Sequence, residues 1–395
     1  MKEQNAVSPE YDVIVVGGGP AGALTAYYLA ASGMKVLILE KERLPRYKAC
    51  GGGITPRALE ALPFDISPVV TQAVSKALML YNNHPVFSHS QKTPLFTMVM
   101  RDDFDHFLVE QAVGLGARLQ EATRFESVCG PAGKLRVTTT QGVFKAKLLV
   151  GADGVNSRVA KALGLGVSTR YMTALEGEVY PGTNLDLERF SKALHYDFGV
   201  IPKGYGWVFP KGDHLSVGVG TFAKKATGIN RAFERYLCLK GLSHARKISP
   251  LKGHLIPALP RKSSQVSCDR GLVVGDAAGY GDPLTGEGLY YAFSGAKMAA
   301  DTLVEAMDTD PSHPMAAFDV KLKKAFFREL TAAHAMAWVL YSLPGLSRRL
   351  LGAQGRNLGK SQLEVVAGRL SYTKLFARLL LRMMNPVRVL SVLFR

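Results

Sequence analysis

The chain has 395 residues, of which 47% are hydrophobic and 21% are charged, and its formal net charge at pH 7 is +17. This length predicts a large core in two lobes, and the composition excludes a disordered chain. The four cysteines are scattered along the chain, which predicts neither a metal site nor a disulfide framework. The N-terminus is polar and no apolar run is long enough to span a bilayer, so we expect no membrane span and a cytoplasmic location.

The first predicted elements are a β-strand, a tight turn and a helix. Residues 11–16, Tyr-Asp-Val-Ile-Val-Val, run into the sequence Gly-Gly-Gly-Pro-Ala-Gly, which a helical pattern follows. In this motif Gly17 makes the turn, Gly19 lets the backbone approach a pyrophosphate, and Gly22 lets the helix pack on the sheet. The helix N-terminus then faces the phosphates. These residues predict a dinucleotide-binding site.

A second predicted strand, residues 35–39, ends in Glu40. Its carboxylate stands where it can accept hydrogen bonds from the hydroxyl groups of an adenosine ribose. An acid at this position favours FAD or NAD over NADP.

Two later segments are typical of the same class of domain. Arg101 opens an Arg-Asp-Asp-Phe-Asp segment, in which it either reaches the cofactor or forms a surface pair with Asp105 four residues on. Residues 151–154, Gly-Ala-Asp-Gly, have the character of a strand end.

The middle of the chain changes to an alternating pattern. Residues 193–200, 206–210 and 215–221 predict strands separated by turns rich in glycine and proline. They indicate an antiparallel sheet inserted into the dinucleotide-binding domain as a substrate lobe.

The second half of the cofactor signature begins at residue 272. An apolar strand delivers Asp276 into a turn of small residues, which places one carboxylate near the sugar-like chain of a flavin. A helix that starts near Gly288 would aim its amides and positive dipole at the pyrimidine edge of the flavin, stabilising the reduced anion. This half selects FAD as the dinucleotide.

The expected fold class is therefore α/β, with a Rossmann-like FAD-binding domain, an inserted antiparallel β-sheet substrate domain and a C-terminal helical segment. The predicted boundaries are 1–74, 100–168 and 266–335 for the FAD-binding domain, 75–99 and 169–265 for the substrate domain, and 336–395 for the basic helical region.

The C-terminal region supplies +9 of the net charge from residue 340 onward, where Glu364 is the single acid. Cations and apolar residues recur there at helical spacing on different faces: Lys374, Arg378 and Arg382 on one, Leu375, Phe376, Leu379 and Met383 on the other. One interpretation is a terminal helix packed on the enzyme body. The other is peripheral contact with an anionic membrane or an acidic partner. No nucleic-acid fold signature accompanies the charge, so a nucleic-acid partner is not expected.

Two local motifs narrow the family. Cys50 lies in an Ala-Cys-Gly-Gly-Gly segment, and Tyr205-Gly-Trp-Val-Phe-Pro is followed after seven residues by Gly218-Val-Gly220. Over about residues 11–303 the chain resembles the geranylgeranyl reductase family of FAD-dependent oxidoreductases, which carries a cysteine-glycine stretch and a Tyr-x-Trp-x-Phe-Pro segment. The resemblance implies saturation of prenyl double bonds, on a chlorophyll-linked chain, an ether lipid, a quinone tail or free geranylgeranyl diphosphate.

The resemblance also implies roles for individual residues. The expected cofactor-binding residues are Gly17, Gly19, Ala21, Gly22, Glu40, Cys50, Gly51, Gly53, Arg101, Phe125, Asp276, Gly288 and Leu289. The expected substrate-binding residues are Tyr205, Trp207, Phe209, Gly218 and Gly220. A rigid aromatic wall is apolar enough for an isoprenoid, while the Tyr and Trp polar atoms can still find partners. The alternative for these aromatics is an ordinary sheet core.

The expected chemistry needs a proton donor. An isolated alkene has no carbonyl group to accept charge, so hydride addition at one carbon must be coupled to protonation of the other. Cys50 is the first candidate catalytic residue, because a thiol in an apolar pocket stays protonated. The alternatives are that it only packs on the flavin, or that water held by Tyr205 supplies the proton.

Only one dinucleotide fingerprint is present, so electrons would come from transiently bound NAD(P)H or from reduced ferredoxin, whose acidity suits a basic surface. Three other functions remain open at this stage. They are a flavin monooxygenase or halogenase, a non-catalytic prenyl-binding protein, and a quinone-linked electron-transfer flavoprotein.

Overall fold

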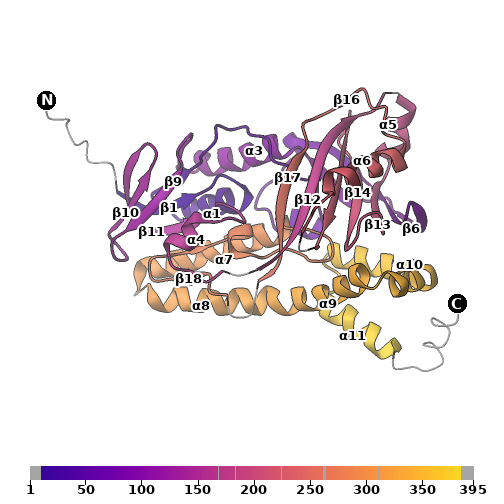
Figure 1. Cartoon of the computed structure of the whole chain (residues 1–395). Coiled ribbons are helices and arrows are strands. Elements are labelled where there is room, and N and C mark those ends of the chain that lie inside the picture. Colours follow the sequence, from indigo (N-terminus) through magenta and orange to yellow (C-terminus); the bar gives the residue numbers. More distant parts are fainter. Residues whose placement is uncertain are drawn as a thin grey trace.

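The computed structural model describes residues 10–383 apart from 168, 183, 224, 261–263 and 310. Residues 384–395 of the predicted basic helical region, and the side chains of Arg382 and Met383, therefore lie outside the described part of the chain. Figure 1 shows two upright sheets side by side, with long helices running beneath both of them. No helix among the described residues is long and apolar enough to cross a membrane.

The first sheet has the strand order β18-β19-β11-β1-β2-β8, with β10 paired to β11 and β9 paired to β10. Its strands are β1 (Glu10–Val16), β2 (Val36–Leu39), β8 (Arg118–Gln120), β9 (Phe125–Cys129), β10 (Leu135–Thr139), β11 (Gly142–Gly151), β18 (Ser267–Cys268) and β19 (Gly271–Val273). Strands β19, β11, β1, β2 and β8 run parallel to their neighbours in this order. Their carboxyl ends meet at one edge, where open α/β sheets bind ligands.

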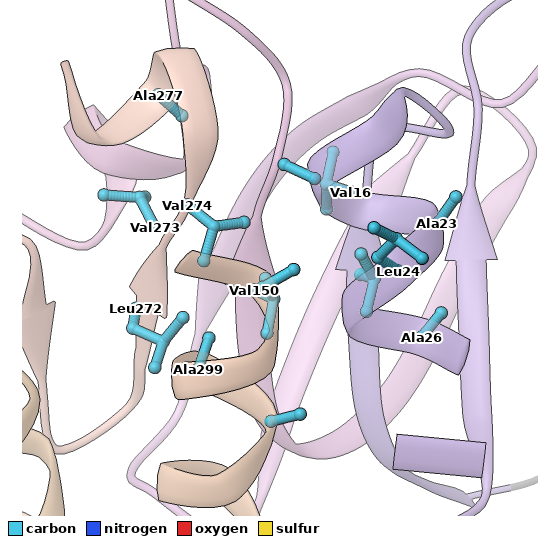
Figure 2. Packing of buried hydrophobic residues seen from close by; sticks show 14 of the residues in the cluster. Val16, Ala23, Leu24, Ala26, Val150, Leu272, Val273, Val274, Ala277 and Ala299 are labelled. Atoms are coloured by element: carbon cyan, nitrogen blue, oxygen red, sulfur yellow. The ribbon is translucent and has the colours of Figure 1, made fainter. Parts of the chain in front are cut away.

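Small residues let two helices pack closely on this sheet. Helix α1 (Pro20–Ala31) lies beside α7 (Leu289–Asp308), and α3 (Arg101–Gly114) packs against α1. Figure 2 shows Ala23 and Ala26 of α1 and Ala299 of α7 near Val16, Val150 and Leu272 of the strands, and all three alanines are fully buried. The Rossmann-like domain predicted from the sequence is confirmed.

The second sheet has the order β16-β12-β15-β14-β13-β5-β6, with β17 also paired to β12. Its strands are β5 (Lys76–Tyr81), β6 (His84–Ser90), β12 (Thr169–Tyr180), β13 (Leu194–Phe198), β14 (Gly204–Pro210), β15 (Leu215–Thr221), β16 (Lys247–Ile248) and β17 (Lys252–Pro260). The three predicted strands of the middle region correspond to β13, β14 and β15. A small sheet of β3 (Gly53–Ile54), β7 (Phe96–Val99) and β4 (Val70–Val74) lies apart from it.

One pairing in the second sheet departs from the antiparallel arrangement expected. Strands β5 and β13 run parallel, with Leu194 opposite Ala77. Antiparallel neighbours are usually joined by hairpins, whereas β5 comes from a much earlier part of the chain and reaches the sheet through a long connection. The sheet is therefore mixed. The domain boundaries drawn from the sequence stay a prediction.

Each face of the second sheet carries a different apolar layer, because side chains alternate along a strand. On β14, Val208 packs toward α6 (Ile229–Lys240), while Tyr205, Trp207 and Phe209 belong to a separate cluster on the opposite face. The predicted aromatic wall therefore occupies one face.

The C-terminal region is helical. Helix α8 (Ser312–Leu322) packs on α7 and β18, and a π-helical turn (Lys323–Phe327) joins it to α9 (Arg328–Ser342). Helices α9 and α10 (Pro344–Val366) cover the aromatic side, and α11 (Tyr372–Met383) follows them. Helix α10 packs on β5 and β6, and α11 packs on α9. The remaining helices are α2 (Pro56–Glu60), α4 (Arg158–Ala162), α5 (Asn184–Ser191) and two short 3-10 turns, Ser67–Val69 and Gly275–Ala278.

Candidate active site

A cavity of about 1330 Å³ lies between the two sheets and continues to the C-terminal helices. Small-molecule sites usually occupy roughly 300–1,000 Å³, so this cavity has room for more than a single small ligand. Its lining joins the glycine turn, the Cys50 segment, the aromatic wall and α9 to α11.

The glycine turn forms the nucleotide end of the cavity. Gly17 has a φ of +109°, and a Cβ there would clash with the Ala152 carbonyl oxygen. A Cβ at Gly19 would meet nothing closer than an Arg46 nitrogen at 3.7 Å, so the side of Gly19 toward the cavity is open. Gly22 does not line the cavity, since a Cβ there would clash with the Gly17 carbonyl oxygen. The three glycines therefore have the geometry expected for turn, phosphate approach and packing.

Glu40 also lies at this end, and it is 3% exposed. Its carboxylate accepts hydrogen bonds from the backbone N–H of Gly18 at 2.8 Å and of Glu42 at 3.0 Å. Each carboxylate oxygen has further acceptor capacity, so the group is fixed in place and still able to bind a ribose. Phe125 is buried at the start of β9 and lines the same end.

Asp276 marks the other end of the cofactor site. Its Oδ2 lies 3.9 Å from His254 Nε2, and Lys48 Nζ lies 3.0 Å from the same nitrogen. Burial alone would raise the pKa of Asp276, but His254 and Lys48 outweigh it and lower that pKa. Burial, helped by Arg101, lowers the pKa of Lys48. Both basic neighbours were missed from the sequence, because β17 and residue 48 meet only in the folded chain.

The expected helix start is confirmed. Helix α7 begins at Leu289 with Gly288 as its N-cap, and no side chain caps its first amides. Gly288, Leu289 and Ala21 all line the cavity. These free amides at a positive helix end fit an anionic ring system.

The glycines that follow Cys50 are required because this segment passes close to other side chains. A Cβ at Gly51 would lie 2.7 Å from the Phe209 ring, and one at Gly52 would clash with Lys211 Nζ. Gly53 lines the cavity as well. Only glycine lets this segment pass so close to the aromatic wall, and the Cys50 Sγ, which accepts from the Gly52 N–H at 3.4 Å, is thereby held in the cavity.

Arg101 is not a surface residue, since it is 6% exposed and lines the cavity. It nevertheless makes the predicted pair with Asp105, through two hydrogen bonds of 2.7 and 3.0 Å. Arg46 donates to the same carboxylate at 3.1 Å. Arg101 thus lines the cavity and pairs with Asp105 at the same time, because the ion pair within the helix orients the guanidinium toward the cavity.

The aromatic wall has its polar atoms satisfied, as expected. Tyr205 Oη donates to the Thr285 carbonyl oxygen at 2.7 Å, and Trp207 Nε1 donates to Ser216 Oγ at 3.2 Å. Burial raises the pKa of Tyr205. A hydroxyl that is committed to a carbonyl and holds its proton more tightly is a poor proton source, so the geometry favours a wall role for Tyr205 over a catalytic one.

Gly218 and Gly220 stand on β15 beside β14. Neither lies among the described residues that line the cavity. A Cβ at Gly218 would clash with the Trp207 ring and a Cβ at Gly220 with the Met172 side chain. These glycines therefore make room behind the wall, and a direct contact between them and the substrate stays a prediction.

The far part of the cavity is an apolar channel that the sequence-based site did not include. Its lining from the C-terminal helices is mostly apolar: Met336, Val339, Leu340, Leu346, Leu350, Leu351, Leu358, Leu363, Val366, Phe376, Leu379 and Leu380, with Ser347, Gln354, Gly359 and Gln362 between them. The i, i+4 spacing of leucines in α10 is the signal that marks this face. At Gly359 a Cβ would clash with the Phe87 ring, so glycine lets α10 approach β6.

Helix α11 turns its apolar face inward. Leu375 is 3% exposed and packs with Tyr372, while Phe376 and Leu379 line the channel. Lys374 is exposed, as the basic face requires. The packed-helix interpretation is therefore confirmed for this face, and the membrane interpretation stays a prediction.

Three tyrosines from separate elements hold the loop that precedes α7. Besides Tyr205, Tyr341 Oη donates to the Leu284 carbonyl oxygen at 2.6 Å, and Tyr372 Oη donates to Asp282 Oδ2 at 2.6 Å. Arg57 and Glu287 form a further ion pair beside them. The C-terminal helices thus support the cofactor side of the cavity as well as the channel.

Comparison with known proteins agrees with this geometry. A family model described as an FAD binding domain matches residues 10–313. The geranylgeranyl diphosphate reductase of Rhodobacter capsulatus is 31% identical over 329 residues, which cover 80% of each chain. The chain belongs to the geranylgeranyl reductase family.

Other members and a solved structure extend the comparison. A digeranylgeranylglycerophospholipid reductase of Methanosphaerula palustris is 29% identical over 311 residues, covering 75% of this chain and 77% of that one. A geranylgeranyl bacteriochlorophyll reductase-like protein of Thermoplasma acidophilum has a TM-score of 0.80 at 23% identity, covering 94% of this chain and 99% of that one. This last likeness shows the shared fold, and the family membership confirms FAD as the cofactor.

This geranylgeranyl reductase family member also buries an acidic pair that was missed from the sequence. Glu176 is 3% exposed, lines the cavity and accepts from the Cys50 N–H at 3.0 Å. Burial and the neighbouring Glu178 raise the pKa of Glu176 to about 7. The signal was present as two glutamates spaced by two within the apolar segment Leu-Glu-Gly-Glu-Val.

Proposed function

We propose that the protein is an FAD-dependent reductase that saturates carbon–carbon double bonds of an isoprenoid chain. The main support for this proposal is one continuous cavity that joins the cofactor site to the apolar channel. Reduced FAD, when bound, supplies hydride to one carbon of an alkene. The residues of the chain must then position the alkene, exclude water and provide a proton for the other carbon.

The binding roles follow from the geometry. Gly19, Glu40 and Asp276 would hold the cofactor along its length, while the amides at Leu289 would face its ring system. Trp207 and Phe209 form a rigid apolar surface on the opposite side, which orients a flexible prenyl chain and keeps water from the reacting carbons.

The substrate class proposed is a prenyl lipid or prenyl diphosphate. Relatives named geranylgeranyl diphosphate reductase and digeranylgeranylglycerophospholipid reductase support both forms. The leucine-lined channel suits the shared C5-repeat tail. The electron donor, NAD(P)H or reduced ferredoxin, stays a prediction.

A direct test uses dithionite-reduced protein, geranylgeranyl diphosphate and deuterium oxide under anaerobic conditions. We expect saturated product that carries two solvent-derived deuterium atoms for each reduced double bond, because flavin reduced by dithionite also takes its transferable hydrogen from solvent. Product that requires oxygen would support a monooxygenase or halogenase instead. Binding of the prenyl chain without any saturation would support a non-catalytic prenyl-binding protein.

Cys50 is the proposed immediate proton donor. Cys50→Ser is expected to keep FAD but to lose roughly a hundredfold to ten-thousandfold in rate, the usual contribution of general acid catalysis. Single-turnover rates of the reduced variant measure this loss, and Cys129→Ser, at an exposed site, is the matched control. An unchanged rate in Cys50→Ser would leave Cys50 only a packing role.

The basic face of α11 is proposed to contact anionic membranes. Leu380 and Leu381 are 46% and 69% exposed near Arg378, and Trp338 of α9 is 53% exposed. A cation near such a surface contributes about 1 kcal/mol. Lys374→Glu with Arg378→Glu should therefore release the protein from phosphatidylserine vesicles in a sedimentation assay. Equal binding of this variant and the parent protein would contradict the proposal.

A further inference from the structure

A row of buried titratable groups crosses from the cavity to the outer surface. Glu176 and Glu178 lie on the same face of β12, because side chains alternate along a strand. Glu178 is 5% exposed, and its Oε2 lies 3.3 Å from His214 Nε2. His214 Nδ1 lies 2.7 Å from Asp213 Oδ1, and the Asp213 side chain is 81% exposed. The row therefore begins at the cavity and ends in solvent.

A tight turn builds the outer half of this row. Residues 211–214 connect β14 to β15, and the Lys211 N–H donates to the His214 carbonyl oxygen at 2.8 Å. This turn directs both Lys211 and His214 inward, where they are 2% and 5% exposed. The same strand that carries the aromatic wall thus ends in the residues that face the acidic pair.

Two cations face the acidic pair. Lys211 Nζ lies beside both glutamates and donates to the Val99 carbonyl oxygen, and Arg101 lies beside Glu176. Burial and the charge of Glu178 nevertheless raise the pKa of Glu176, so Glu176 keeps a proton more readily than an ordinary carboxyl group. Glu178 Oε2 and His214 Nε2 are also buried without a well-formed hydrogen bond. This leaves polar sites through which a proton can pass.

Other charged or titratable groups face the row from neighbouring elements. They are Arg101 of α3 beside Glu176, Tyr47 against Glu178, Tyr180 stacked on His214 at 4.8 Å, Lys247 above Tyr180, and Arg246 near Asp213. Burial alone would lower the pKa of His214, but Glu178 and Asp213 outweigh it and raise that pKa. His214 therefore binds a proton more readily than an ordinary imidazole does.

We propose that His214, Glu178 and Glu176 form a proton path that reloads Cys50 from the surface at Asp213. The inference rests on the proposed reductase function. For each double bond saturated, one alkene carbon receives hydride from reduced FAD and the other receives the Cys50 proton. Glu176 returns a proton to the thiolate and regains one from His214 through Glu178. His214 then takes a proton from water, so protons and electrons balance.

Loss of the proton path should slow later turnovers but not the first one. In Glu176→Gln the amide oxygen can still accept from the Cys50 N–H, but the side chain cannot pass a proton. The thiol is loaded before the first reaction, so the single-turnover rate should stay within about threefold of the parent rate. The steady-state rate should fall roughly a hundredfold, as expected when general acid supply is lost. His214→Asn should show the same division, and His195→Asn, which removes a buried histidine on β13, should show neither change.

The pH profile gives a second readout. Glu176 can deliver a proton only in its acid form, so the steady-state rate of the parent protein should fall as the pH rises through about 7. Glu176→Gln should lose this limb. Infrared difference spectra of the FAD-loaded protein should contain a carboxylic acid band that titrates over the same range and that disappears in Glu176→Gln.

Failure of the path and failure of the reductase proposal give different results. Absence of saturated product from the parent protein would overturn the reductase function. Normal product formation with an unchanged steady-state rate and pH profile in Glu176→Gln would overturn the path. Absence of a titrating carboxylic acid band near neutral pH would overturn it as well, independently of activity.

Discussion

Leu358→Trp is expected to abolish reduction of long prenyl chains while leaving FAD in place. Leu358 is half-buried on α10 and lines the apolar channel. A bulkier side chain there would exclude part of the isoprenoid tail. Burial of a CH₂ group stabilises by about 0.8 kcal/mol, so displacing one five-carbon unit costs about 4 kcal/mol. The rate at low substrate concentration should fall several hundredfold for a geranylgeranyl substrate.

Chain length provides the control for this result. A geranyl substrate does not need the far end of the channel, so its reduction should change little in Leu358→Trp. Asn357→Trp adds the same side chain at an exposed position of the same helix and should leave both substrates unaffected. An equal loss with short and long substrates would show that the channel does not hold the tail.

Asp276→Ala should weaken the binding of FAD. The carboxylate lines the cavity and is held beside His254 and Lys48, where it can accept hydrogen bonds from the sugar-like chain of the flavin. A hydrogen bond to a charged group contributes about 1.5–3 kcal/mol, which corresponds to a loss of roughly tenfold to a hundredfold in affinity. Titration of the FAD-free protein, followed by flavin fluorescence, measures this change.

Asp301→Ala is the matched control for the loss of a carboxylate. Asp301 lies on α7, and its side chain is exposed and pairs only with Lys297 within the described residues. It should retain the parent affinity. Full flavin content in Asp276→Ala would exclude the proposed contact.

The FAD-binding half of the molecule was predictable because its signals are local. The site depends on a positive φ at Gly17, on close helix packing at Gly22 and on an acid at the end of β2. Each of these needs a particular residue type within a short stretch of the chain, so the sequence predicts it directly. The alternating aromatics of β14 were readable for the same reason, since the period of a strand assigns Tyr205, Trp207 and Phe209 to one face.

The apolar channel could be predicted only in part from the sequence. The periodicity of the C-terminal segment predicted helices and an apolar face on α11, but periodicity does not say which surface the face meets. Leu375, Phe376 and Leu379 turn toward the enzyme body because α9 and α10 bring that body to them. A membrane would have satisfied the same pattern.

By itself, the sequence determined the α/β fold class, the FAD site and the aromatic wall, since each depends on backbone geometry within a few residues. Only the tertiary structure decided the parallel pairing of β5 with β13, the roles of Gly218 and Gly220 behind the wall, and the meeting of Glu176, Lys211 and His214. These features join parts of the chain that are distant in sequence. Burial and charge act through space, so the shift in the pKa of Glu176 exists only once the surrounding strands have packed.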